Sequence, residues 1–169
     1  MSKERKKDFL MDRDREFEHF FRKHQNTLFK VVFGYVAQHE ITEDLVIETF
    51  IKIYDRWKKV RRMENPAGYL IRSGINHAKT YLKWDSKQRT VYISENEYSK
   101  AGDSPEMIYF LNQENRTLVT ELLRLKEGER NIVLLKDLSG KKFQEIAHVL
   151  DIKLPTVKSI YRRAKIKLA

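Results

Sequence analysis

The chain has 169 residues, and 34 Lys and Arg against 24 Asp and Glu give it a formal net charge of +10. This surplus favours a polyanionic partner, either a nucleic acid or an anionic membrane surface, over a basic surface that is merely solvated. The absence of Cys excludes disulfides and thiolate metal sites and is typical of a reducing compartment. The charged first ten residues exclude a signal peptide, and no apolar run reaches the roughly 20 residues of a membrane span. The sequence therefore predicts a cytoplasmic protein.

Helical periodicity covers the first half of the chain after a charged beginning. Residues 1–13 alternate charges without a period and are predicted to be a disordered tail. Thr42 is expected to be the N-cap of a helix, and Asn65 with Pro66 marks the start of another. Together the apolar spacings predict one small helical domain over residues 14–86, with helices over Phe17–Tyr35, Thr42–Val60 and Pro66–Trp84.

Residues 87–104 break this pattern and are predicted to be a flexible linker. Ser104 and Pro105 then cap and open a further helix. Three short helices follow, and strand signals are almost absent. The predicted fold is all-α, with a second helical domain over residues 105–169.

The last two predicted helices have the layout of a DNA-binding helix-turn-helix. Phe143, Ile146 and Leu150 form one apolar stripe, residues 151–154 form a turn, and Pro155 occupies a first helical position. Cations without any carboxylate cover the other side of the last helix, which suits the acceptor edge of guanine or phosphates. A basic amphipathic helix inside a bundle is the alternative. The predicted contacts to duplex DNA are Thr156, Lys158, Ser159, Arg162 and Arg163.

The helix Thr42–Val60 has two apolar sides. Val46, Phe50 and Trp57 belong to an ordinary buried stripe, and the opposite side mixes acids with large apolar groups. Burial of unpaired carboxylates is costly, so a partner face is favoured over burial all round. This predicted face comprises Asp44, Ile47, Glu48, Ile51 and Tyr54.

The helix Pro66–Trp84 carries a polar ridge beside its core stripe. Cations interleaved with aromatic rings suit single-stranded nucleic acid, because charges follow phosphates and rings stack on unpaired bases. A solvated basic face with scattered aromatics is the competing interpretation. The predicted strand contacts are Tyr69, Arg72, Asn76, Lys79, Lys83 and Trp84.

Three stretches resemble the extracytoplasmic-function (ECF) group of bacterial sigma factors in the sigma-70 family. The stretch from Gly140 to Leu150, followed by Thr156-Val-Lys-Ser159, looks like region 4. The stretches Glu43-Asp-Leu-Val-Ile-Glu-Thr-Phe50 and Asn65–Asn76 are similar to region 2. Departures include Ile47 in place of Gln and Lys142 in place of a capping Ser.

The resemblance implies a transcription initiation factor that directs RNA polymerase to a class of promoters. The Asp44–Tyr54 face would bind the β′ clamp helices, the helix from Pro66 would melt the minus-ten element, and region 4 would read the minus-thirty-five element and contact the β flap. The loop before Pro66 would receive a flipped base, with Arg61, Arg62 and Asn65 as contacts. An anti-sigma factor is a further candidate partner.

No nucleophile triad, paired carboxylates, phosphate loop or metal-binding His spacing stands out. The sequence therefore predicts no enzyme activity, no metal, no cofactor and no small-molecule substrate. Two rivals remain open: an autonomous helix-turn-helix regulator that works without polymerase, and an RNA- or DNA-processing enzyme.

Overall fold

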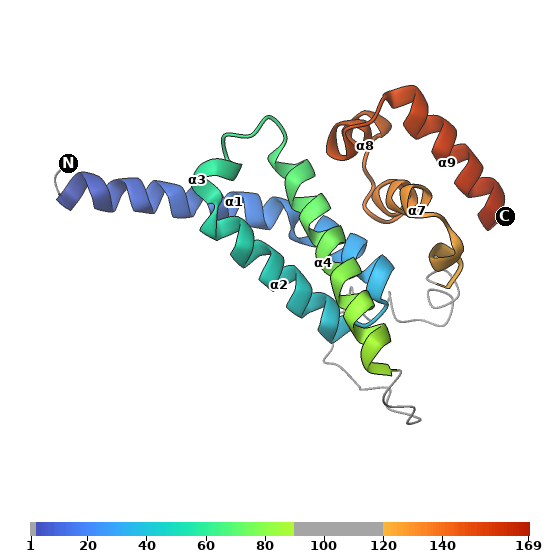
Figure 1. Ribbon diagram of the computed structural model, residues 1–169. Helices are drawn as coiled ribbons and strands as arrows, with labels where there is room; N and C mark the ends of the chain where they lie inside the picture. Colours follow the sequence, from blue (N-terminus) through green and yellow to red (C-terminus); the bar gives the residue numbers. More distant parts are fainter. Residues whose placement is uncertain (1–2, 90–119) are drawn as a thin grey trace.

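A computed structural model describes residues 3–89 and 120–169 of the chain (Figure 1). These residues form two groups of helices, and no strand occurs in either described range. The predicted all-α fold with two helical domains is confirmed. The first group comprises α1 (Lys3–Val36), α2 (His39–Asp55), α3 (Trp57–Val60) and α4 (Pro66–Arg89). The second comprises α7 (Glu127–Val133), the π-helical turn η1 (Leu134–Leu138), α8 (Phe143–Leu150) and α9 (Leu154–Leu168).

Aromatic side chains of α1 organise the core of the N-terminal domain. The rings of Phe17 and Phe20 lie 5.3 and 4.9 Å from that of Trp57, and Phe21 lies 4.6 Å from Phe50. Aromatic pairs at such separations add about 0.5–1.5 kcal/mol beyond the burial of their area. This clustering fixes α1 against α2 and α3, and α4 closes the bundle.

Helix α1 begins at Lys3, so the predicted disordered tail over residues 1–13 is wrong from Lys3 onward. The absence of an apolar period before Phe17 underlies that prediction, and the apolar residues described there, Leu10 and Met11, are exposed. Polar contacts hold the segment just before Phe17: Arg13 donates to Tyr54 at 2.7 Å, and Glu16 pairs with Arg61 at 2.6 Å.

The second helix begins at His39, three residues before the predicted cap Thr42. Thr42 is fully buried, and its hydroxyl donates to the carbonyl of Gln38 at 2.6 Å instead of accepting from the helix. Ala37, with a left-handed φ of 58°, separates α1 from α2. A single left-handed residue makes a tighter connection than the sequence indicated.

Helix α4 runs past Trp84 to Arg89, which includes the first three residues of the predicted linker. The rest of that linker, and the predicted helix start at Ser104, lie outside the described residues. Residues 120–124 are helical.

The C-terminal domain packs α7, η1, α8 and α9 around Ile132, Ile146 and Val157, all fully buried. Lys142 precedes α8 without a side-chain cap, as expected from the missing Ser. Glu145 nevertheless accepts a hydrogen bond from the Lys142 backbone N–H at 2.7 Å, so half of a capping box remains. The same half of a capping box occurs at the start of α7, where Glu129 accepts a hydrogen bond from the Lys126 backbone N–H at 3.1 Å.

Candidate nucleic-acid and polymerase interfaces

The turn between α8 and α9 sets the direction of the last helix. Asp151 adopts a left-handed φ of 54°, and the N–H of Ile152 donates back to the carbonyl of Ala147 at 3.0 Å. This backbone pattern closes α8 and reverses the chain. Pro155 in the first turn of α9 then starts this last helix with a suitable φ.

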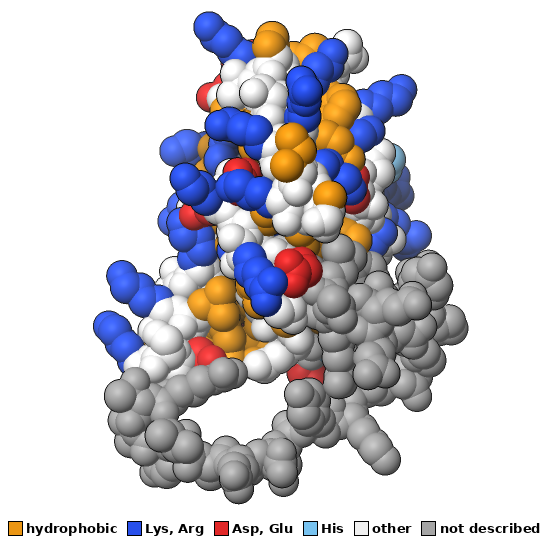
Figure 2. Space-filling view, turned by 90° about the vertical axis from the view of Figure 1, so that its right-hand side faces the viewer, with side chains coloured by type: hydrophobic (Ala, Val, Ile, Leu, Met, Phe, Trp, Pro, Cys, Tyr) orange, Lys and Arg blue, Asp and Glu red, His pale blue; other side chains and the backbone are white. Residues whose placement is uncertain are grey.

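The side of α9 away from the core is exposed and basic. Val157 and Ala164 are fully buried and mark the inner face. All five predicted duplex contacts are exposed: Thr156, Lys158, Ser159, Arg162 and Arg163. Figure 2 shows that Lys and Arg side chains are spread over this side of the molecule.

Only some cations of α9 are neutralised. Lys165 pairs with Asp137 at 2.9 Å, and Lys167 pairs with Glu129 at 2.7 Å. Among the described residues, no hydrogen bond or ion pair engages the side chains of Lys158, Arg162 or Arg163. The structure therefore divides the cations into a set that anchors α9 to α7 and η1 and a set that is free to meet phosphates or base edges.

Tyr161 is a further anchor of α9. Its hydroxyl donates to Asp137 at 2.7 Å, and this bond, together with burial, raises the pKa of Tyr161 to about 12. Its ring packs against Phe143 of α8 at 5.2 Å. Tyr161 thus joins α9, η1 and α8 and fixes α9 on the domain.

The predicted polymerase face on α2 is largely exposed. Ile47 and Ile51 keep 54% and 55% of their surface in solvent, and Asp44 and Glu48 are exposed beside them. The alternative of a helix buried all round is therefore wrong. His77 of α4, which sequence reasoning did not single out, lies 3.0 Å from the Glu48 carboxylate. Burial first, and Lys52 second, lower the pKa of His77.

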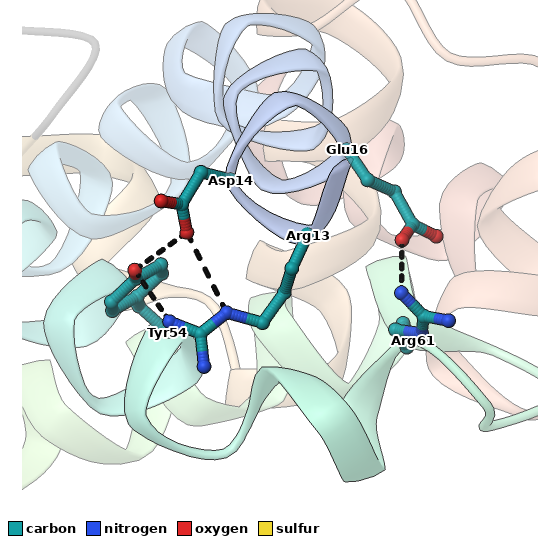
Figure 3. Close-up of polar contacts among 5 residues, drawn as sticks. All are labelled: Arg13, Asp14, Glu16, Tyr54 and Arg61. Atoms are coloured by element: carbon teal, nitrogen blue, oxygen red, sulfur yellow. Dashed lines mark hydrogen bonds and ion pairs between the residues drawn. The ribbon is translucent and has the colours of Figure 1, made fainter. Parts of the chain in front are cut away.

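Tyr54, the fifth residue of that predicted face, is only half exposed because α1 holds it (Figure 3). Arg13 donates to the Tyr54 hydroxyl at 2.7 Å, the hydroxyl donates to Asp14 at 2.7 Å, and the guanidinium lies 4.9 Å over the ring. No sequence pattern indicates these partners, since they lie about 40 positions away in a segment without an apolar period. Tyr54 therefore links α1 to the candidate face.

The loop before α4 also has partners that the sequence did not indicate. Arg61 pairs with Glu16 of α1 at 2.6 Å (Figure 3). Asn65 caps α4 by accepting from the N–H of Gly68 at 2.8 Å, and its amide donates to the carbonyl of His148 in α8. Arg62 is exposed.

The ridge on α4 is exposed at most of its predicted positions, namely Arg72, Asn76, Lys79, Lys83 and Trp84. Trp84 keeps 56% of its surface in solvent, and its ring lies 6.1 Å from that of Tyr81. Lys79 pairs with Glu127 of the C-terminal domain at 2.9 Å.

Tyr69 differs from the other ridge residues because it is half buried. It lines a hollow of about 370 Å³ together with Asp55, Arg56, Lys58, Lys59, Val60 and Met63. This hollow lies beside the loop from Arg61 to Asn65 and is lined by three cations.

No cluster of His, Cys, Asp or Glu suited to a metal ion occurs in the described ranges. Within the same ranges, no helix is long and apolar enough to cross a membrane.

Comparisons with known proteins identify both helical domains. The profile "Sigma-70 region 2" matches residues 20–88, and the profile "Sigma-70, region 4" matches residues 115–168. The chain belongs to the sigma-70 family. It is a sigma factor of the ECF group and acts as an RNA polymerase-dependent initiation factor, which confirms the resemblance found in the sequence.

Similar curated proteins cover most of the chain. RNA polymerase sigma factor YlaC of Bacillus subtilis is 26% identical over 156 residues, which are 89% of this chain and 88% of YlaC. The ECF RNA polymerase sigma-E factor of Escherichia coli K12 is 29% identical over 153 residues, which are 85% of this chain and 79% of that protein.

Two solved structures share the fold. CnrH, in complex with the cytosolic domain of CnrY, aligns with a TM-score of 0.62 and 19% identity, over 92% of this chain and 86% of CnrH. The sigma factor RpoE of Bartonella quintana, in complex with the anti-sigma factor NepR, aligns with a TM-score of 0.64 and 18% identity, over 90% of this chain and 94% of that chain.

Proposed function

We propose that this sigma factor uses three separate surfaces during initiation. The exposed side of α2 binds the polymerase clamp, α4 with the preceding loop captures the minus-ten strand, and α9 reads the minus-thirty-five duplex. The observation that carries the proposal is the set of cations on α9 that no acid of residues 3–89 or 120–169 neutralises, displayed on the second helix of a helix-turn-helix. Such a helix places its N-terminal half in the major groove.

In this proposal the exposed residues of α9 read the DNA duplex. An Arg or Lys that pairs bidentately with guanine contributes about 1–3 kcal/mol of discrimination against another base. The remaining cations of α9 pair with phosphates and set the register of the helix.

Strand capture falls to α4 and its loop. Arg72, Asn76 and Lys83 follow the backbone of an unpaired strand, and Trp84 stacks on a base. The hollow beside Tyr69 has a half-buried aromatic wall and cationic lining, which suit a base turned out of the stack together with its phosphate. Opening of the duplex is then stabilised by holding one strand.

Polymerase binding falls to Ile47, Glu48 and Ile51 with Asp44 and Tyr54. Large apolar side chains that are this exposed, next to acids, are more typical of a surface that binds a partner than of one that stays in solvent. The β flap is the proposed partner of the C-terminal domain. CnrH and the RpoE factor are each recorded with a bound partner, CnrY and NepR, so an anti-sigma factor is proposed for this chain as well.

In this proposal the protein is no enzyme and needs no cofactor or small-molecule substrate. It positions the polymerase in the cytoplasm and holds DNA, and the polymerase makes the bonds.

Run-off transcription with core polymerase on a promoter library tests the proposal. The expected result is a transcript set that depends on this factor and shares two sequence elements. Full-strength and selective binding of duplex DNA without core, with no effect on transcription start sites, would instead indicate an autonomous regulator.

A further inference from the structure

His77 of α4 lies against the proposed polymerase face and contacts three side chains of α2. The His77 side chain is only 15% exposed, whereas the Glu48 side chain beside it is 58% exposed. Nδ1 of His77 lies 3.1 Å from the Thr49 hydroxyl. Nε2 lies 3.0 Å from the Glu48 carboxylate and 3.4 Å from the Lys52 ammonium. A largely buried ring therefore contacts two charged side chains at the surface.

The surroundings of Nδ1 fix one hydrogen on the His77 ring. Thr49 is only 1% exposed, and its hydroxyl donates to the carbonyl of Leu45 at 2.6 Å. A hydroxyl has one hydrogen, so the Thr49 oxygen accepts from His77 and Nδ1 carries the hydrogen of this contact. Nε2 is then the nitrogen that gains or loses a proton.

Nε2 faces two side chains of opposite charge. Without a proton it offers a lone pair, which accepts from the Lys52 ammonium and repels the Glu48 carboxylate. With a proton it donates to Glu48 in a charge-assisted hydrogen bond, and the positive ring repels Lys52. The two protonation states of His77 therefore hold different side chains of α2.

Neutral pH favours the state in which Glu48 is free. Burial first, and Lys52 second, lower the pKa of His77, and Glu48 opposes them only in part. Lys52 and Glu48 are the charged groups that act on this pKa, and both belong to α2. The ring therefore takes up its second proton only below pH 6.5. Above that pH the carboxylate of Glu48 is available beside the exposed side chains of Ile47 and Ile51.

The geometry points to His77 as a positioning residue of the polymerase face, which decides whether Glu48 or Lys52 is free to meet the partner. The inference rests on the proposed function, in which this face binds the clamp. With a neutral ring, Glu48 is free to pair with a cation of the polymerase. A proton on Nε2 withdraws Glu48 to the ring and adds a positive charge, so polymerase binding weakens in acid. Because linkage is reciprocal, polymerase binding in turn releases this proton.

Nitrogen NMR of the free wild-type protein tests the assigned hydrogen. Long-range correlation spectra distinguish a protonated ring nitrogen from a bare one, and the signals of His77 are those that His77→Gln removes. At about pH 7.5 we expect a hydrogen on Nδ1 and none on Nε2, and in acid we expect hydrogens on both. A neutral ring with its hydrogen on Nε2 would overturn the inference, because that ring could hold Glu48 without taking up a proton.

Binding to core polymerase, measured by fluorescence anisotropy between about pH 7.5 and about pH 5.5, tests the consequence. We expect the affinity of the wild type to fall roughly threefold to fivefold more over this range than that of His77→Gln, which cannot take up the proton. A merely structural role of His77 would change the affinity by the same factor at every pH. The matched control is His19→Gln, which removes an exposed histidine of α1 and should keep the wild-type pH dependence.

Glu48→Gln separates this inference from the proposed function. In that background, His77→Gln should lose most of its effect on the pH dependence, because the ring has no carboxylate to withdraw. Weakened binding by Glu48→Gln at neutral pH, together with a wild-type pH dependence in His77→Gln, would overturn the role of His77 alone. Full-strength binding of core polymerase by Glu48→Gln at neutral pH would instead overturn the proposed polymerase face.

Discussion

The cations of α9 and those of α4 with its loop are similar in type but differ in their surroundings. Lys158, Arg162 and Arg163 have no partner among the described residues and are available as they stand. Arg61 and Lys79 are each paired with a carboxylate, at 2.6 and 2.9 Å. Among the predicted DNA contacts, the cations of α9 are therefore unpaired within the described residues, whereas two of those on α4 and its loop are paired with acids.

The difference shows that charge in a sequence indicates a nucleic-acid partner without showing which cations are free. Exposed ion pairs are worth only about 0–1 kcal/mol, so DNA phosphates can replace them. Each pair nevertheless lowers the local positive potential until it is replaced. Four experiments sharpen this contrast between the domains.

The largest expected difference between the two domains is in how their stability changes as the pH falls. Burial, and then Lys141, lower the pKa of His24 from 6.5 to about 4. The unfolded state therefore binds a proton first, and the N-terminal domain should lose stability as the pH falls from 6.5 to about 4, by at most about 3 kcal/mol. In the C-terminal domain, the hydrogen bond from Lys167 lowers the pKa of Glu129. This domain should therefore begin to lose the stability that Glu129 contributes only below about pH 4.5.

Urea unfolding across this pH range checks the order. Both Trp residues lie in the N-terminal domain, so their fluorescence reports on that domain alone. His24→Gln should flatten the dependence between pH 6.5 and 4. The same slope in the variant as in the wild type would show that another group is responsible.

The available surface of α9 should give the next largest effect. If Arg163 pairs with a guanine, Arg163→Ala should cost roughly 1–3 kcal/mol in promoter use and relax the preference at one position. If it meets only a phosphate, all promoters should weaken about equally and the salt slope should fall by about one unit. Library transcription at two salt concentrations separates these outcomes.

Lys165→Ala, which removes a cation already paired with Asp137, is the control for Arg163→Ala. Wild-type selectivity and wild-type salt dependence of the Arg163 variant would contradict DNA contact by this face.

Trp84→Ala should weaken open-complex formation by about 1–3 kcal/mol through lost stacking, while binding to core polymerase is unchanged. Permanganate reactivity of promoter thymines measures the open complex. Leu10→Ala, another exposed apolar residue, serves as the control. Unchanged thymine reactivity in the Trp84 variant would exclude strand stacking at this position.

The smallest effect should come from Glu16→Gln, which releases Arg61 from its ion pair. We expect a gain of no more than about 1 kcal/mol in binding to single-stranded DNA, together with a salt slope steeper by up to about one unit. Glu18→Gln breaks a similar exposed pair with Arg22, away from the loop, and should change neither quantity. Equal effects of the two substitutions would mean that Glu16 acts only through net charge.

Much of the fold and of the α9 surface could be predicted because local rules govern them. The apolar stripe of α8, the turn and Pro155 depend on neighbours within a few residues, and the structure has the turn and both helices within a residue of the predicted ends. The start of α1 could not be predicted in this way. The segment before Phe17 carries no apolar period, and Arg13 and Glu16 within it contact Tyr54 and Arg61, which lie about 40 positions away.

The sequence by itself determined the helical class, the two-domain order, the family and the residue types on each candidate surface, because periodicity, capping residues and short motifs are local properties. Tertiary structure alone decided which of those residues are free. Glu16 and Glu127 reach their cations, and Asn65 reaches the carbonyl of His148, only after segments distant in the chain are packed together. A hydrogen bond or an ion pair depends on distance in space, and no local pattern encodes the distance between two domains.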